Sequence, residues 1–188
     1  TVEAVAAAAV RHGLRPLVVD PVMVATSGDP LLTDNAIDAV RRLLLPLATL
    51  ATPNLDEAAK LTGQSRARNV AEAEAQGQAI LALGPKAVLV KGGHGEGDVV
   101  TDVLVSANAP PQHFSSPRID TRHTHGTGCT LSASITAFLV LGYPLDDAVR
   151  LAKAFVWEAL RHGAKLQVGH GNGPVDHLHA IRRLPQQL

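Results

Sequence analysis

The chain has 188 residues, the usual size of one compact domain, which is expected here to span residues 1–188. Hydrophobic residues make up 46% and aromatic residues only 3%, so the composition excludes disorder and predicts a core of Ala, Val, Leu and Ile. Lys and Arg number 17, as do Asp and Glu, so no broad basic surface is expected to bind nucleic acid. A single cysteine excludes an internal disulfide framework, and no run approaches the roughly 20 apolar residues of a membrane helix. We therefore expect a cytoplasmic protein without a membrane or nucleic-acid partner.

Short apolar runs alternate with helical patterns through the first half of the chain. Gly and Pro residues mark the ends of several of these segments. The predicted elements are a helix over 1–12, a strand over 15–21, a helix from Thr33 or Asp34 to Pro46, a strand over 47–53, a helix over 54–63, a helix over 70–83 and a strand over 86–93.

The second half is expected to contain one more clear strand and two long helices. Residues 98–106 read as a strand that alternates its faces, and the prolines between 110 and 117 indicate a loop or an edge strand. Helices are predicted over 130–141 and 145–162, followed by a Gly-rich turn and a short terminal helix. Strands alternating with helices predict an α/β fold with a mostly parallel sheet. Ligands of such sheets gather beyond the carboxyl ends of the strands, where Asp20, Asn54 and Lys91 fall.

The stretch "GTGC", from Gly126 to Cys129, contains the only cysteine and precedes the helix predicted over 130–141. Two glycines leave backbone amides free to face a ligand, and the helix adds its positive end, so an anion site is predicted. A thiol in this place is expected to have a lowered pKa, and hence the character of a base or nucleophile. The alternative is a small apolar cysteine that packs at a helix start, and spacing alone does not decide between the two.

Two carboxylates have both a functional and a structural interpretation. Asp20 ends a strand and could hold Mg²⁺, or could simply form the turn before a proline. Glu57 lies three residues after Asn54, which is the form of a helix capping box. Its functional role would require the carboxylate to face a magnesium–phosphate group, and the local sequence favours the cap.

A Gly-rich turn, "KGGHGEG", follows the strand over 86–93 and includes Lys91 and Gly93. It could cradle nucleotide phosphates, although it is neither a Walker A loop nor a dinucleotide fingerprint.

The nine histidines do not predict a metal centre. His123, His125 and Cys129 lie in one loop without a partner pair, which is a poor zinc signature. The three histidines near the end of the chain are expected at the surface or in terminal turns; they are His170, His177 and His179.

Five stretches, taken in order, resemble the ribokinase-like superfamily and, more closely, the hydroxymethylpyrimidine/phosphomethylpyrimidine kinases of thiamine biosynthesis. They are "VVDPVMVATSGDPLL", "ATPNLDEAAKLTG", "VLVKGGH" followed by "DVL", "HTHGTGCTLSASI" and "GHGNGPVDHLH". The resemblance implies a three-layer fold with a mostly parallel central sheet. It also implies ATP-dependent phosphorylation of a pyrimidine alcohol and of its monophosphate with Mg²⁺, by a homodimer.

The same resemblance implies a role for each candidate residue. Cys129 would be the base for the substrate hydroxyl, beside an anion hole formed by the backbone of Gly126, Thr127 and Gly128. Magnesium, phosphates and substrate would be held by the residues near the strand ends. Asp20, Asn54 and Glu57 would organise magnesium and phosphates, Asp20 and Val22 would contact the pyrimidine, and Lys91 and Gly93 would lie near the ATP phosphates.

Two departures from the family pattern limit this resemblance. Thr26 stands where the family often has Lys, so no role is assigned to that position. Members normally begin with a Gly-rich strand and an "AGIQAD"-like helix, which nothing here matches, so the chain is expected to be the C-terminal part of such a kinase. Two other functions stay open: a pyridoxal- or pyridoxine-type kinase of the same superfamily, and a catalytically silent nucleotide-binding remnant or regulatory module.

Overall fold

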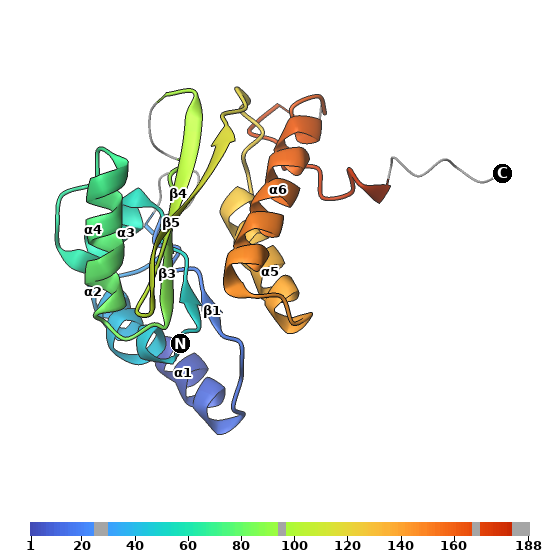
Figure 1. Ribbon diagram of the computed structural model, residues 1–188. Coiled ribbons are helices and arrows are strands. Elements are labelled where there is room, and N and C mark those ends of the chain that lie inside the picture. The colour runs from blue at the N-terminus through green and yellow to red at the C-terminus, as the bar shows by residue number, and fades with distance from the viewer. Residues whose placement is uncertain (25–29, 94–96, 167–169, 182–188) are drawn as a thin grey trace. The chain divides into compact units, whose positions relative to one another are not determined.

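The computed structural model describes residues 1–24, 30–93, 97–166 and 170–181 (Figure 1). It divides the chain into two compact units, Thr1–Pro117 and Arg118–Leu188, and fixes the internal arrangement of each. Thr26 lies outside the described residues. Among the described residues, no helix has the length and apolar character needed to cross a membrane.

The first unit is built on a five-stranded mixed sheet in the order β1-β2-β3-β4-β5. The first three strands are parallel and the last two form an antiparallel hairpin. This arrangement confirms the α/β class expected from the alternating pattern. The strands are β1 (Val18–Val19), β2 (Leu50–Ala51), β3 (Ala87–Val90), β4 (Val99–Ser106) and β5 (Ala109–Pro117).

Helices connect the parallel strands, and local capping explains where several of them begin and end. Thr33 accepts a hydrogen bond from the Ala36 amide, as predicted, and Gly63 closes its helix in the left-handed conformation. The prediction that Pro46 ends the second helix was wrong. The chain instead continues through a short 3₁₀ turn, where a proline near the start loses no needed hydrogen bond. The elements are α1 (Val2–Arg11), α2 (Asp34–Ala39), the π-helix η1 (Val40–Leu44), the 3₁₀ helix η2 (Leu45–Leu47), α3 (Leu55–Thr62) and α4 (Val70–Leu81).

The core of the first unit is aliphatic, as the composition predicted. Helix α4 packs on β3 and β4, and α3 packs on α4 (Figure 1). The expectation that β4 alternates its faces was wrong, because residues 102–105 are all buried. β4 lies between β3 and β5 in the sheet, and because consecutive residues of a strand point to opposite faces, the buried run shows that both faces are covered there. The proline-rich β5 is an edge strand, where missing amide donors are tolerated.

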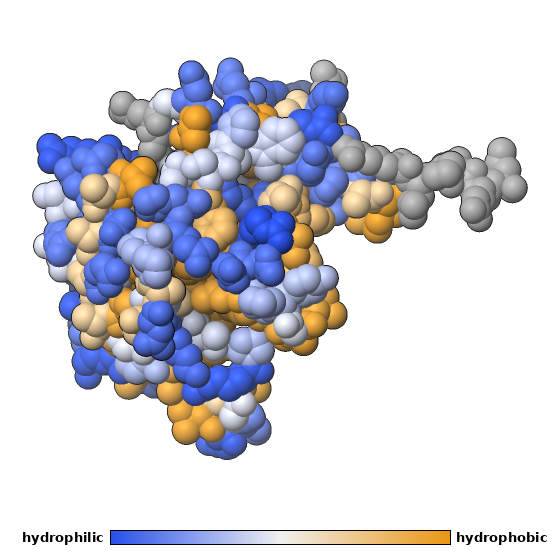
Figure 2. Space-filling model, in the orientation of Figure 1, coloured by the Kyte–Doolittle hydropathy of each residue, from blue (hydrophilic) through white to orange (hydrophobic). Residues whose placement is uncertain are grey.

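The second unit contains a pair of packed helices, α5 (Thr127–Val140) and α6 (Leu145–Gly163). α5 begins three residues earlier than predicted, so Cys129 lies inside its first turn. The described part of the predicted terminal helix forms turns at residues 177–180 instead. On the face shown in Figure 2, hydrophobic and hydrophilic side chains are interspersed.

Candidate active site

Three polar side chains follow directly on the ends of the three parallel strands. Asp20 follows β1, Thr52 follows β2 and Lys91 follows β3. The Lys91 ammonium lies 2.6 Å from Asp20 Oδ1, and the Thr52 hydroxyl donates to the same oxygen at 3.1 Å. The predicted position of Asp20 and Lys91 at the carboxyl ends of the strands is therefore confirmed. Sequence reasoning missed Thr52, although its place one residue after a buried strand was a usable signal.

Glu57 combines the two interpretations that the sequence offered for it. Asn54 Oδ1 accepts from the Glu57 amide at 2.8 Å, and Glu57 Oε2 accepts from the Asn54 amide at 2.7 Å, which completes the capping box at the start of α3. The same Oε2 lies 4.0 Å from the Lys91 ammonium. A capping residue thus also supplies a second carboxylate beside Lys91.

The cluster is largely shielded from water. The side chains of Asp20, Lys91 and Glu57 are 13%, 12% and 7% exposed. Burial raises the pKa of the Glu57 carboxyl above its ordinary value, and the nearby Lys91 charge and backbone donors oppose that rise. Asp20 Oδ2 is buried without a hydrogen-bond partner in the described part of the chain. The cluster therefore holds an acceptor for a further cation or donor.

We expect Glu57→Gln to gain stability relative to the wild type as pH rises from 3 to 7. The raised pKa means that ionising Glu57 costs more in the folded chain than in the unfolded chain. The stability that protonated Glu57 contributes to the folded chain is fully present below pH 4.5, the ordinary pKa of a Glu carboxyl. It is lost as the pH rises through the higher pKa of the folded state. Gln does not titrate and can serve in the capping box, so it avoids this loss. Urea unfolding at several pH values measures the difference.

Glu72→Gln is the matched control, since Glu72 also follows an Asn cap, Asn69, by three residues. Hydrogen bonds from Arg68 lower the pKa of Glu72. The stability that the ionised Glu72 contributes is therefore present above pH 4.5 and is lost as the pH falls through the lower folded pKa. The Gln variant should therefore lose stability relative to the wild type as pH rises, the opposite trend to Glu57→Gln. The same trend in both variants would contradict the assignment of burial as the cause at Glu57.

The donor set fits magnesium bound together with a nucleotide. Mg²⁺ prefers oxygen ligands and is commonly held by one or two carboxylates plus substrate phosphates. Within the described residues Asp20 offers a buried oxygen without a hydrogen-bond partner, and the Glu57 carboxylate lies 4.0 Å from the same Lys91 ammonium. Within the described ranges, no three His, Cys, Asp or Glu side chains gather to hold a metal by themselves.

The other residues predicted near the strand ends have clear positions in the first unit. Val22 is half-buried, and its amide donates to the Asp20 carbonyl at 2.9 Å. Gly93 is exposed in the turn after β3, with open space around its Cα. Between Lys91 and Gly93, the Gly92 amide donates to Asp102 Oδ1 at 2.8 Å. That contact, which the sequence did not reveal, fixes the turn that carries Lys91.

The predicted anion site lies in the second unit, at the start of α5. Gly126 is the N-cap with φ +83°, a conformation that favours glycine. The Thr127 amide already donates to the Thr124 carbonyl at 3.2 Å. The first amides of a helix have no intrahelical partner, which leaves those of Gly128 and Cys129 for an anion. Cys129 is a free, exposed cysteine in this first turn.

The three histidines near the end of the chain lie at the surface or in a terminal turn, as predicted, although one of them is buried. His170 and His177 are exposed, in line with the prediction. His179 lies in a terminal turn but is only 5% exposed, and its ring stacks on His162. His123 is 8% exposed. These positions depend on packing between distant segments, which the sequence pattern does not show.

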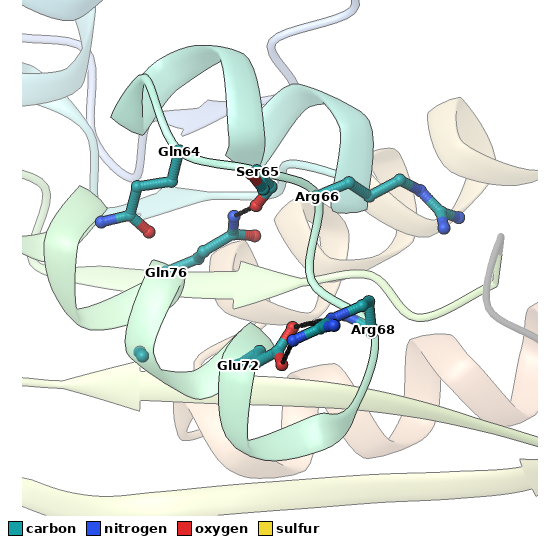
Figure 3. Close-up of a pocket in the computed structure, with 7 residues that line it drawn as sticks. Gln64, Ser65, Arg66, Arg68, Glu72 and Gln76 are labelled. Carbon is teal, nitrogen blue, oxygen red and sulfur yellow. Dashed lines mark hydrogen bonds and ion pairs between the residues drawn. The ribbon is translucent and has the colours of Figure 1, made fainter.

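A pocket of about 610 Å³ in the first unit is lined by none of the predicted site residues; Figure 3 shows its lining. Its two arginines are already paired, Arg66 with Asp56 at 2.9 Å and Arg68 with Glu72 at 2.8 Å. Because their charges are balanced, the pocket offers no excess positive charge for nucleotide phosphates. It is lined by Gln64, Ser65, Arg66, Arg68, Glu72, Ala75 and Gln76.

Known proteins share these sequence and structural features. A family model described as phosphomethylpyrimidine kinase matches residues 1–176. Over 95% of its length the chain is 49% identical to hydroxymethylpyrimidine/phosphomethylpyrimidine kinase of Rhizobium meliloti (strain 1021), and likewise 49% identical over 95% to that of Salmonella typhimurium (strain LT2). It spans 66% and 67% of the length of these relatives, about two thirds.

Among solved structures, an ADP complex of pyridoxal kinase from Bacillus subtilis matches with a TM-score of 0.87 and 33% identity. The match covers 96% of this chain and 67% of that one. It confirms the ribokinase-like fold class expected from the five motifs. With a family model over residues 1–176 and relatives at 49% identity, the chain belongs to the phosphomethylpyrimidine kinase family.

Proposed function

We propose that the protein transfers the γ-phosphoryl group of ATP to the hydroxyl of 4-amino-5-hydroxymethyl-2-methylpyrimidine, and then to the resulting monophosphate, in thiamine biosynthesis. The observation that carries the proposal is the buried Asp20–Lys91–Glu57 cluster at the carboxyl ends of parallel strands. It is supported by the 49% identity to relatives named for this activity. The ADP bound to the related pyridoxal kinase supports ATP as the donor.

In this proposal the strand-end cluster binds the nucleotide. Lys91 and the turn at Gly93 lie near the ATP phosphates, and Asp20, Asn54 and Glu57 hold the metal-bound phosphates in place. Mg²⁺, when bound, supplies positive charge to the phosphate oxygens. Asp20 Oδ2 is the oxygen of this carboxylate that is available to the cation, because Oδ1 already accepts from Lys91 and Thr52.

The start of α5 acts on the transferring group. The oxygen of the substrate hydroxyl forms a bond to the γ-phosphorus while the bond between that phosphorus and the ADP oxygen breaks. Cys129 is the base that accepts the hydroxyl proton. The backbone amides of Gly128 and Cys129, which follow the Gly126 cap, and the positive end of α5 stabilise the equatorial phosphoryl oxygens.

The remaining parts of the proposal concern substrate contact and assembly. Val22 and Asp20 face the pyrimidine, and Val22 is half-buried beside Asp20, with its amide on the Asp20 carbonyl. The protein acts as a homodimer in the cytoplasm. Analytical ultracentrifugation at micromolar concentration tests the dimer, and a monomer mass would overturn it.

A pyridoxal-type kinase is the second candidate. The TM-score of 0.87 to the pyridoxal kinase of Bacillus subtilis favours it specifically. Turnover by the full-length protein on hydroxymethylpyrimidine, its monophosphate and pyridoxine separates the two functions. Our proposal expects the highest kcat/KM on the pyrimidine alcohol, with the monophosphate also accepted. Preference for pyridoxine, without phosphorylation of the pyrimidine monophosphate, would favour the second candidate instead.

A further inference from the structure

The segment Gly173–His177, which has no part in the proposed reaction, packs against the start of α5. Its Gly173 carbonyl accepts from the His125 amide at 3.2 Å, and the Val175 amide donates to the His125 carbonyl at 3.4 Å. Two residues further on, His177 Nε2 lies 2.8 Å from the Thr130 hydroxyl. The segment Gly173–His177 therefore flanks both the loop before α5 and its first turn.

The direction of the His177 hydrogen bond follows from the chemistry of Thr130. Its hydroxyl lies 2.7 Å from the Gly126 carbonyl, which can only accept, so the single hydroxyl proton is donated there. The hydroxyl can then only accept from His177. His177 thus carries a proton on Nε2, and a chain of donors runs from His177 through Thr130 to the carbonyl of Gly126.

That carbonyl belongs to the residue on which the anion site depends. Gly126 is the N-cap of α5, and its carbonyl also accepts from the Thr130 amide at 2.9 Å. Fixing it fixes the peptide that precedes the Gly128 and Cys129 amides. The segment Gly173–His177 also packs closely at its first residue, because a Cβ at Gly173 would overlap Nδ1 of the buried His123.

We propose that His177 is a positioning residue: by donating to Thr130 it holds the first turn of α5 so that the Gly128 and Cys129 amides face the transferring phosphoryl group. This inference rests on the proposed function for its kinetic consequence. Its structural consequence, a more rigid first turn of α5, can be measured without any turnover.

Three variants of the exposed His177 separate the donor from the side chain's bulk. Gln places an N–H close to the position of Nε2, whereas Asn places one close to Nδ1, and Phe keeps the ring without a donor. We expect His177→Asn and His177→Phe to lower kcat about 3- to 10-fold, the effect of one hydrogen bond, with KM for ATP within about twofold. His177→Gln should keep wild-type kcat. Equal kcat for Gln and Asn, or a loss confined to KM, would overturn the proposal.

Amide hydrogen exchange of Thr130, read by NMR on the protein without substrate, is the second measurement. Exchange should accelerate about 3- to 10-fold in His177→Asn and His177→Phe but not in His177→Gln. In the double variant Thr130→Val/His177→Phe, the amide of residue 130 should exchange no faster than in Thr130→Val alone. Both changes remove the same hydrogen bond between the two side chains. Unchanged exchange in His177→Phe would overturn the positioning role. A wild-type protein that phosphorylates neither pyrimidine would overturn the proposed function, while the exchange data still decide on His177.

Discussion

Replacing Cys129 by Ala should slow phosphorylation of the hydroxymethylpyrimidine alcohol by about 10²- to 10⁴-fold, the usual contribution of a general base. The first acceptor is a neutral alcohol, whose proton must leave as the bond to phosphorus forms. The second acceptor is a phosphate that is already ionised near neutral pH, since its second pKa is about 6. It needs little help from a base, so the second step should lose far less. The backbone amides serve both steps and survive the substitution.

Cys129→Ser is the companion variant, and it should behave like Ala because a hydroxyl is a much poorer base in the same place. Cys129 is exposed, so neither change creates a cavity and the free energy of unfolding should stay within about 0.5 kcal/mol. The assay is single-turnover phosphorylation of each acceptor, with ATP binding checked separately. Equal losses in both steps would instead give Cys129 a positional role. Wild-type rates in both would exclude a catalytic role for Cys129.

Replacing Gly92 by Ala should destabilise the first unit by about 3 kcal/mol, at the upper end of the cost of overpacking. The added Cβ would overlap the carbonyl oxygen of Thr101, a backbone atom of β4 that cannot swing aside. The backbone must shift, and with it the hydrogen bond from the Gly92 amide to Asp102. Because Lys91 is the adjacent residue, ATP affinity should also fall.

Gly93 provides the control for that variant. A Cβ there meets no atom within 4 Å, although Gly93 is the next residue in the same turn. Gly93→Ala should therefore change the free energy of unfolding by no more than about 0.5 kcal/mol. Urea unfolding of both variants decides the matter. Similar losses in the two would mean that the turn needs glycine for its flexibility and not for the close approach of Thr101.

What the sequence predicted correctly depends on short-range rules. Asn54 and Glu57 form their capping box because the spacing of three places each side chain on the other's amide. Asp20 and Lys91 are 71 residues apart, yet their contact was foreseeable, because parallel strands bring their carboxyl ends to one edge.

What it could not predict depends on which surfaces become neighbours. The contact between Gly92 and Thr101 exists because β3 and β4 pair in one register, which no local pattern encodes. His179 lies in a terminal turn, one of the two predicted alternatives, but its burial depends on stacking against His162 of α6, which the sequence does not show. β4 was expected to alternate because its sequence does, but residues 102–105 are buried on both faces, which depends on what packs against the sheet and not on the strand's own pattern.

The most direct test of the account is a single-turnover reaction of the full-length protein with γ-labelled ATP, Mg²⁺ and hydroxymethylpyrimidine. We expect the label to appear first on the pyrimidine monophosphate and then on the diphosphate, with one ADP formed for each phosphoryl group transferred. Lys91→Met should bind ATP more weakly and transfer less label, since it removes the ammonium that the cluster holds between Asp20 and Glu57. Bound ATP that transfers no label to the pyrimidine would contradict the account and would indicate a nucleotide-binding protein without kinase activity.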